Sequence, residues 1–223
     1  MSEAPTTLGR YRIGRMLGAG AFGEVYLATL HGAEGFEKRV AIKVLASDRP
    51  GCDPGRQRAF IREGMLGADL QQANIVGVHE FGEEGGRYYL VMDYIDGISL
   101  RALLSICTGR GTRLPTDAVC ELGTQICIGL DHAHRATTRD GRPMNLVHRD
   151  LKPANLMLDR TGTVRIVDFG IARTASQTYF TTAAGQVKGT PAYMAPEQVV
   201  GEATLTGAVD QFALGLVLCE AAS

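Results

Sequence analysis

A short segment in the second half of the chain, His148-Arg-Asp-Leu-Lys-Pro-Ala-Asn155, places three polar side chains at close and fixed spacing. They belong to Asp150, Lys152 and Asn155, and Asp168 follows thirteen residues after the asparagine, directly before Phe-Gly. A carboxylate can orient a hydroxyl and accept its proton, and amide and carboxylate oxygens are ligands that Mg²⁺ prefers. With a lysine added, these are the groups that phosphoryl transfer from ATP to a hydroxyl requires. The spacing therefore predicts a phosphotransfer site built from two loops.

A glycine-rich stretch upstream, Gly18-Ala-Gly-Ala-Phe-Gly-Glu-Val25, is flanked by strand-like runs at 11–17 and 25–30. Glycines let the backbone approach phosphates closely and point its N–H groups at them. The same G-x-G-x-x-G string occurs in dinucleotide-binding βαβ units, where the loop runs straight into a helix. Here Val25 and Tyr26 continue as a strand, so the sequence predicts a hairpin that covers phosphates.

Lys43 lies inside the apolar run Val40-Ala-Ile-Lys-Val44, which is typical of a buried strand. Burial of an ammonium group among apolar side chains is costly unless an anion pairs with it. The α- and β-phosphates of ATP would supply such an anion, because the glycine-rich stretch and the Asp150 segment are also predicted to bind ATP.

The order of these segments resembles that of protein kinases, and the resemblance covers about residues 8–220. The stretch Gly189-Thr-Pro-Ala-Tyr-Met-Ala-Pro-Glu197 resembles the P+1 loop and A-P-E segment of that family. Asp-Phe-Gly-Ile-Ala-Arg173 and Ala-Pro-Glu-Gln198 are similar to the bacterial, eukaryotic-like (Hanks-type) serine/threonine kinases. The resemblance implies an α+β fold class, a two-lobed kinase fold with a small β-rich N-lobe and a helical C-lobe.

The chain is predicted to divide in the same way. Residues 1–10 form a polar N-terminal tail, 11–92 the N-lobe, 93–98 a hinge, and 99–223 a partial C-lobe. In the C-lobe a helix beginning near Pro115 carries a stripe of apolar residues at three-to-four spacing. The stripe consists of Val119, Leu122, Ile126, Leu130 and Ala133.

The resemblance also assigns roles. Asp150 is implied to be the catalytic base and Lys152 to steady the transferred phosphate, while Asn155 and Asp168 hold Mg²⁺, or Mn²⁺ in its place. Glu63, in the helical stretch 56–70, is implied to form the ion pair with Lys43 that kinases use. The alternative for Glu63 is an ordinary solvated position on that helix.

ATP contacts are implied along both lobes, with Met92 as gatekeeper and backbone groups near Asp93 and Ile95 bonding the adenine edge. Asp210 is implied to bond back to the backbone of the catalytic loop. The residues assigned to ATP are Leu17, Gly18, Ala19, Gly20, Ala21, Phe22, Gly23, Val25, Ala41, Lys43, Met92, Asp93, Ile95 and Met157.

Regulation is expected on the loop between Asp168 and Glu197, which is rich in threonine. An arginine directly before the catalytic aspartate, here Arg149, can bind a phosphorylated residue on such a loop. Thr181 and Thr182 stand at about the right distance before Gly189 to be autophosphorylated. The alternative is that these threonines are merely polar loop residues.

Three functions compete. An ATP-dependent serine/threonine protein kinase acting on protein substrates is favoured, because Asp-Leu-Lys-Pro resembles serine/threonine kinases, whereas tyrosine kinases usually carry Arg and Ala in this loop. A catalytically weak or inactive kinase fold could instead serve as an ATP-binding scaffold, yet Lys43, Asp150 and Asp168 are all present. Small-molecule phosphotransferases of related fold typically lack the Gly-Thr-x-x-Tyr-x-Ala-Pro-Glu segment.

The composition of the chain limits which binding partners and which cellular location are expected. A formal net charge of −1 over 223 residues argues against broad binding to nucleic acid or anionic membranes. No apolar run approaches the ~20 residues that span a bilayer, and the N-terminus lacks the apolar core of a signal peptide. The five cysteines form no C-x-x-C pair and lie mostly in apolar helical stretches, so we expect buried, reduced thiols and a cytoplasmic location.

A kinase C-lobe usually has several helices beyond the point where this sequence stops, at Ser223. We therefore expect an incomplete C-lobe in which the apolar face of residues 212–222 is partly uncovered. Such a face favours association with a partner or with a second copy of the chain.

Overall fold

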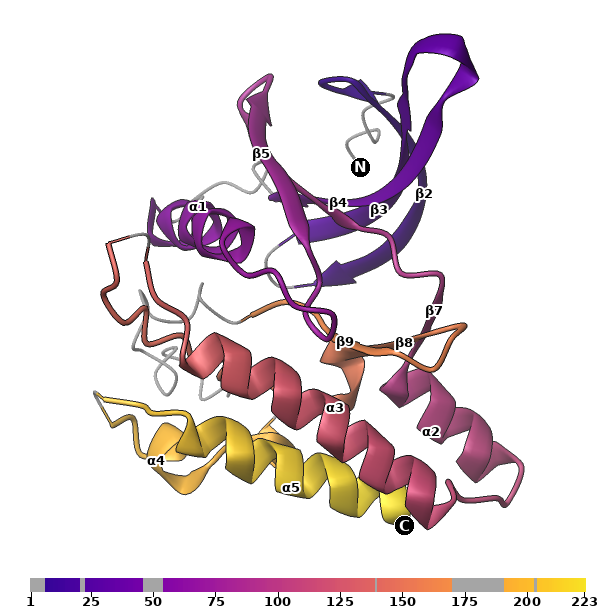
Figure 1. Cartoon of the computed structure of the whole chain (residues 1–223), viewed down its shortest axis with the longest axis vertical. Coiled ribbons are helices and arrows are strands. Elements are labelled where there is room, and N and C mark those ends of the chain that lie inside the picture. The colour runs from indigo at the N-terminus through magenta and orange to yellow at the C-terminus, as the bar shows by residue number, and fades with distance from the viewer. Residues whose placement is uncertain (1–6, 21–22, 46–53, 139, 170–190, 203) are drawn as a thin grey trace, which may run out of the picture. The chain divides into compact units, whose positions relative to one another are not determined.

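The structure, a computed structural model, describes residues 7–20, 23–45, 54–138, 140–169, 191–202 and 204–223 (Figure 1). The chain divides into two compact units. The sheet unit comprises Met1–Leu70 and Gly77–Ile95, and the helical unit comprises Gln71–Val76 and Asp96–Ser223. The segment Gln71–Val76 therefore packs with the helical unit although sheet-unit residues flank it on both sides.

The sheet unit is built on a six-stranded antiparallel sheet with the order β1-β2-β3-β4-β6-β5. Valine, isoleucine and tyrosine recur in these strands, and such residues pack well on a pleated surface. The elements are β1 (Thr7–Leu8), β2 (Tyr11–Gly20), β3 (Gly23–His31), the 3₁₀ turn η1 (Ala33–Gly35), β4 (Glu37–Leu45), α1 (Pro54–Ala68), β5 (Val78–Glu84) and β6 (Arg87–Asp93). The predicted hairpin around the glycine stretch is confirmed, because β2 and β3 pair antiparallel across it.

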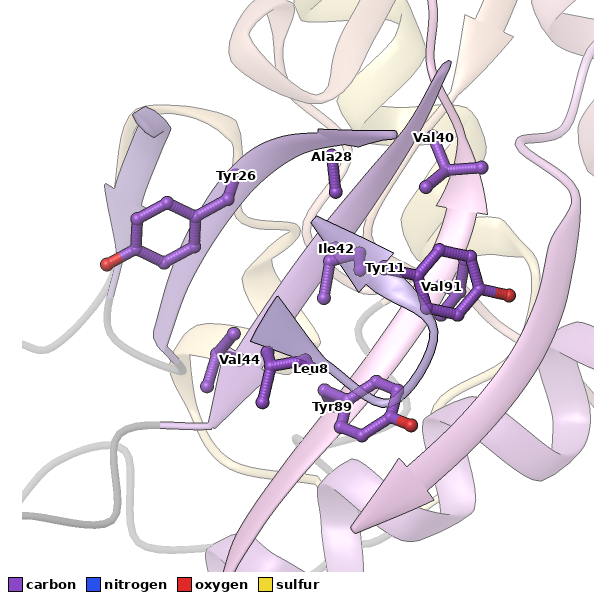
Figure 2. Packing of buried hydrophobic residues seen from close by; sticks show 9 residues of the cluster. All are labelled: Leu8, Tyr11, Tyr26, Ala28, Val40, Ile42, Val44, Tyr89 and Val91. Carbon is purple, nitrogen blue, oxygen red and sulfur yellow. The ribbon is translucent and has the colours of Figure 1, made fainter. Parts of the chain in front are cut away.

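Alternating residues of β3, β4 and β6 form the apolar core on one face of this sheet (Figure 2). Side chains of successive strand residues point to opposite faces, so every second residue reaches the same core. The cluster consists of Leu8, Tyr11, Tyr26, Ala28, Val40, Ile42, Val44, Tyr89 and Val91.

Leu8 corrects the prediction that residues 1–10 form a polar tail. Thr7 and Leu8 form β1, which pairs with β2, and Leu8 is 2% exposed within the core cluster. A two-residue strand is too short to show an alternating pattern, so the sequence carried no local signal for it.

Helix α1 packs beside β5 and β6 (Figure 1). Phe60 is fully buried, and its ring centroid lies 6.1 Å from that of Phe81 on β5. A Cβ atom added to Gly64 would lie 3.0 Å from both Phe81 and Leu90, so this turn of the helix lies very close to the sheet. The helix begins two residues before the predicted stretch 56–70 and ends at Ala68.

The helical unit contains a three-stranded sheet with the order β7-β8-β9 and several helices. Its elements are β7 (Gly97–Ser99), α2 (Leu100–Gly109), α3 (Thr116–His134), η2 (Pro153–Asn155), β8 (Leu156–Asp159), β9 (Val164–Ile166), η4 (Pro191–Tyr193), α4 (Pro196–Val199) and α5 (Ala208–Ala222). Ser99 caps α2, because its hydroxyl accepts a hydrogen bond from the N–H of Ala102 at 3.2 Å.

Helices α3 and α5 lie side by side (Figure 1). A Cβ atom added to Gly123 of α3 would lie 3.2 Å from the side chain of Leu218 of α5. The predicted stripe on α3 is confirmed, since all five of its residues are buried. Burial of one face at helical spacing is what fixes such a helix against its neighbours, because propensity alone contributes little. None of the helices in the described ranges has both the length and the apolar character needed to cross a membrane.

The cysteines differ from expectation. Cys120, Cys127 and Cys219 are exposed and Cys107 is half-buried, all as free thiols, while Cys52 lies outside the described residues. The prediction of buried thiols is therefore wrong for these positions. On α3 the reason is geometric: Cys120 and Cys127 do not belong to the buried stripe that faces the interior.

Helix α5 is apolar on more than one side. Val209, Ala213 and Val217 are buried, whereas Phe212 is 42% exposed. Association through this face stays a prediction.

Candidate active site

The segment that carries Asp150 is anchored from beneath by His148, which is fully buried. The Nδ1 atom of its ring accepts a hydrogen bond from the N–H of Asp150 at 3.2 Å, and Nε2 lies 3.1 Å from the carbonyl oxygen of Val167. These two partners fit the neutral tautomer that carries its proton on Nε2. The ring also packs against Phe169, with 4.9 Å between centroids. His148 therefore joins the Asp150 segment to the residues on either side of Asp168.

The three predicted catalytic-loop side chains meet. Lys152 Nζ lies 2.9 Å from Asp150 Oδ2, in an ion pair whose side chains are 20% and 17% exposed. Asn155 Nδ2 donates to the carbonyl oxygen of Asp150 at 2.9 Å and lies 3.3 Å from Asp150 Oδ2. This carboxylate is held by an ammonium group and an amide and is still reached by solvent. It is therefore suited to accept a hydrogen bond from the hydroxyl group of an incoming molecule.

The side chain of Asp210 anchors the same segment by accepting hydrogen bonds from the backbone N–H groups of the segment. Its Oδ2 accepts the N–H of His148 and its Oδ1 the N–H of Arg149, both at 2.8 Å. The implied bond from Asp210 to the catalytic loop is thus present. His134, at the end of α3, adds a contact that the sequence did not indicate, because its Nε2 lies 2.8 Å from Asp210 Oδ2. The buried carboxylate therefore ties α3 and α5 to the segment that carries Asp150.

The two predicted metal ligands belong to segments that are hydrogen-bonded to each other. The N–H of Val167 donates to the carbonyl oxygen of Asn155 at 3.0 Å, directly before Asp168. Asp168 has a φ of 57°, a left-handed conformation that aspartate tolerates better than most residues.

An amide oxygen and a carboxylate fit Mg²⁺, which usually takes only one or two protein ligands and completes its shell with phosphates and water. Within the described residues no group of three or more His, Cys, Asp and Glu side chains could form a cage for a metal ion. The donor set therefore suits a metal that is held together with the phosphates of a nucleotide.

In the sheet unit, four of the predicted ATP contacts share one face of the sheet. Val25, Ala41, Lys43 and Met92 each stand next to at least one residue whose side chain lies in the core cluster on the opposite face. Val25 pairs in register with Lys43, and Ala41 pairs with Met92. Lys43 is only 5% exposed. The fold thus collects an apolar surface and a buried ammonium group on one side of a single sheet.

The other predicted ATP residues lie as follows. Leu17 is 37% exposed on β2, and Gly18, Ala19 and Gly20 end that strand at the surface. Ala21 and Phe22 lie outside the described residues, as do Thr181, Thr182 and the side chain of Glu63.

Near the predicted hinge, the side chain of Asp93 is fixed by its neighbours. Its Oδ2 accepts the N–H of Gly77 at 3.1 Å, and its Oδ1 lies 2.8 Å from His79 Nε2. The N–H of Asp93 donates to the carbonyl oxygen of Gly77, so that N–H group is not available to an adenine. Ile95 is half-buried beyond β6, and Met157 is half-buried in β8 of the helical unit.

A further polar cluster, which the sequence did not reveal, joins α2, η4 and α5. Arg101 Nη2 donates to the hydroxyl of Tyr193 at 2.9 Å, and its Nη1 lies 3.3 Å from Glu220 Oε1. The hydroxyl of Tyr193 donates to Glu220. Burial, and then the hydrogen bond to Glu220, raise the pKa of Tyr193. The cluster fixes Tyr193 inside the predicted P+1 segment.

Replacement of Gly23 by alanine is expected to lower the free energy of unfolding by about 3 kcal/mol. Gly23 has a φ of 144°, and a Cβ atom there would lie 1.9 Å from the carbonyl oxygen of Val44. Gly20, at the other end of the same hairpin, is the matched control because a Cβ atom there meets nothing within 4 Å. Urea denaturation followed by circular dichroism compares the two variants, and equal losses of stability would contradict the prediction.

Comparison with known proteins gives one answer. The family model "Protein kinase domain" matches residues 11–223. The tyrosine-protein kinase MasK of Myxococcus xanthus is 38% identical over 213 residues, which are 96% of this chain and 32% of MasK. The serine/threonine-protein kinase PrkC of Bacillus subtilis is 36% identical over 95% of this chain and 30% of its own length.

Solved structures of protein kinase domains also match the chain. The crystal structure of the Mycobacterium tuberculosis PknI kinase domain matches with a TM-score of 0.70 and 34% identity, over 96% of this chain and 75% of that one. The chain spans about a third of the length of MasK and PrkC. The two-lobed fold expected from the resemblance is confirmed by this likeness. By its sequence and its fold, the chain belongs to the protein kinase family.

Proposed function

We propose that this kinase domain transfers the γ-phosphoryl group of ATP to serine or threonine hydroxyls of proteins. The observation that carries the proposal is the Asp150 carboxylate, held by Lys152 and Asn155 on a backbone that Asp210 anchors. Preorganised charge and geometry are what phosphoryl transfer demands of a protein, since little covalent chemistry is left to it.

Each residue of the catalytic segment has a distinct task. Asp150 orients the acceptor hydroxyl and takes its proton, and Lys152, 2.9 Å from that carboxylate, neutralises charge on the transferred phosphoryl group. Asn155, through Oδ1, and Asp168 would hold Mg²⁺ or Mn²⁺, because oxygen atoms are the ligands these ions take. When bound, the ion neutralises the phosphate oxygens.

The sheet unit would bind the nucleotide. Val25, Ala41 and Met92 supply an apolar surface for adenine, and Lys43 on the same face pairs with the α- and β-phosphates. Glu63 is proposed as the second partner of Lys43. Support comes from its neighbour Gly64, which lies against Leu90, the register partner of Lys43 in β6. Helix α1 therefore covers the face of the sheet that carries the lysine.

The acceptor class is proposed from Lys152, because an Asp-Leu-Lys-Pro loop is similar to serine/threonine kinases. PrkC carries the name of a serine/threonine kinase, whereas MasK is named a tyrosine-protein kinase. We further propose that Thr181 and Thr182 are autophosphorylated and that Arg149 binds the resulting phosphate. Free thiols at the described cysteines suit a reducing compartment, which supports a cytoplasmic location for this domain.

Intact-mass measurement of the purified chain, incubated with ATP and Mg²⁺, tests the function. We expect the mass of one or more phosphates to be added to the chain or to an added acceptor protein such as casein, and none when EDTA removes the metal. Phosphoamino-acid analysis should then give phosphoserine or phosphothreonine. Phosphotyrosine alone would overturn the acceptor class, and no transfer by a chain that circular dichroism shows to be folded would overturn the activity.

A further inference from the structure

The peptide group between Arg149 and Asp150 is held at both ends by side chains. Its carbonyl oxygen, on Arg149, accepts a hydrogen bond from Gln198 Nε2 at 3.0 Å. Its N–H, on Asp150, donates to His148 Nδ1 at 3.2 Å. Fixing both ends sets the plane of this peptide, and that plane, together with the φ angle of Asp150, determines the direction in which the side chain of Asp150 leaves the backbone.

This peptide needs such support because Arg149 has a φ of 65°. A residue with a Cβ atom adopts the left-handed region at an energetic cost and keeps it only where surrounding contacts enforce it. Asp210 holds the preceding part of the segment by accepting the N–H groups of His148 and Arg149. Gln198 holds the side that leads into Asp150, which Asp210 does not reach through these bonds.

The orientation of the Gln198 amide follows from its two partners. Its Oε1 accepts the N–H of Ala195, the residue before α4, at 3.1 Å, while its Nε2 donates to the carbonyl oxygen of Arg149. Exchanging the two amide atoms would place oxygen against oxygen and nitrogen against N–H. One side chain thus links the start of α4 to the backbone beside the catalytic aspartate.

We propose that Gln198 is a positioning residue for phosphoryl transfer, which acts by holding the Arg149–Asp150 peptide in the orientation that aims the Asp150 carboxylate. The inference rests on the proposed kinase function and adds to it a residue outside the loop that carries Asp150. It predicts that removing the amide donor lowers kcat, because a small misplacement of a catalytic group is costly, and that it leaves ATP binding alone.

Two substitutions separate this role from a merely structural one. Gln198→Glu keeps an oxygen that can accept the N–H of Ala195, but it replaces the donor to Arg149 by a second oxygen. Gln198→Leu removes both bonds. Gln71→Glu is the matched control for the added charge, since Gln71 is exposed in the same unit.

We expect kcat to fall about tenfold or more in Gln198→Glu and Gln198→Leu, with KM for ATP within about twofold of the wild type and Gln71→Glu unchanged. Hydrogen–deuterium exchange should show faster uptake in a peptide covering residues 146–152 in both Gln198 variants, and unchanged uptake in α3. The thermal midpoint of Gln198→Glu should stay close to that of the wild type, because the contact at the start of α4 is kept.

Hydrogen–deuterium exchange tests the positioning role of Gln198 whether or not the chain transfers phosphate. Unchanged uptake in residues 146–152 overturns the proposal, and so does faster uptake with kcat preserved in an active wild type. A rise in KM for ATP at constant kcat would also overturn it, because it would assign Gln198 to nucleotide binding. A wild type that transfers no phosphate overturns the kinase function instead.

Discussion

Asp150→Asn is expected to lower kcat for phosphoryl transfer by about 10²- to 10⁴-fold, the range typical for loss of a positioned general base. The amide has nearly the same shape as the carboxylate, but it cannot take a proton and it ends the ion pair with Lys152 at 2.9 Å. KM for ATP should change little, because the proposed role of Asp150 is toward the acceptor hydroxyl. Steady-state kinetics with an acceptor protein measures both parameters.

Asp140→Asn provides the control for this substitution. Asp140 lies in the exposed loop after α3, where the Thr138 hydroxyl lowers the pKa of its carboxyl group through a hydrogen bond. Its replacement should leave kcat unchanged. If Asp150→Asn retained the kcat of the Asp140 variant, the base would have to be assigned to another residue.

Asp210→Ala is expected to lower the free energy of unfolding by about 3–5 kcal/mol and to abolish phosphoryl transfer. The carboxylate is fully buried and accepts the N–H groups of His148 and Arg149, besides contacting His134 Nε2. Its removal leaves backbone donors in the interior without an acceptor. The backbone that carries Asp150 also loses its anchor.

Urea denaturation measures this loss against Asp131→Ala. Asp131 forms an exposed ion pair with Arg135 on the helix surface, with Asp131 Oδ1 and Arg135 Nε 2.8 Å apart and side chains 59% and 80% exposed. Such surface pairs contribute at most about 1 kcal/mol. Similar destabilisation by the two substitutions would show that the Asp210 network does not hold the unit together.

Much of the local structure could be predicted from the sequence, because it depends on patterns that neighbouring residues carry. The apolar stripe at helical spacing predicted the buried face of α3, and the apolar run around Lys43 predicted the central strand β4. Valine and tyrosine after the glycine stretch gave the β2–β3 hairpin. Leu8 escaped prediction because a lone apolar residue in a two-residue strand has no period.

The polar contacts around the site could be predicted only in part. Asp150, Lys152 and Asn155 are close in sequence, so their meeting follows from one loop. Gln198 and Arg149 are 49 residues apart, and Arg101 and Tyr193 are 92 apart. Nothing in the residue types at those positions selects the partner, since glutamine and arginine are common on any surface.

The sequence by itself determined the chemistry, namely which acids, amides and lysines are present and in what order along the chain. The tertiary structure decided which distant residues form hydrogen bonds with the segment that carries Asp150 and with its anchor, Asp210. Packing of α3 against α5 brings His134 to Asp210, and the start of α4 brings Gln198 to the backbone of Arg149. The physical reason is that a left-handed residue such as Arg149 is enforced by hydrogen bonds from distant elements, and those contacts exist only once the elements have packed.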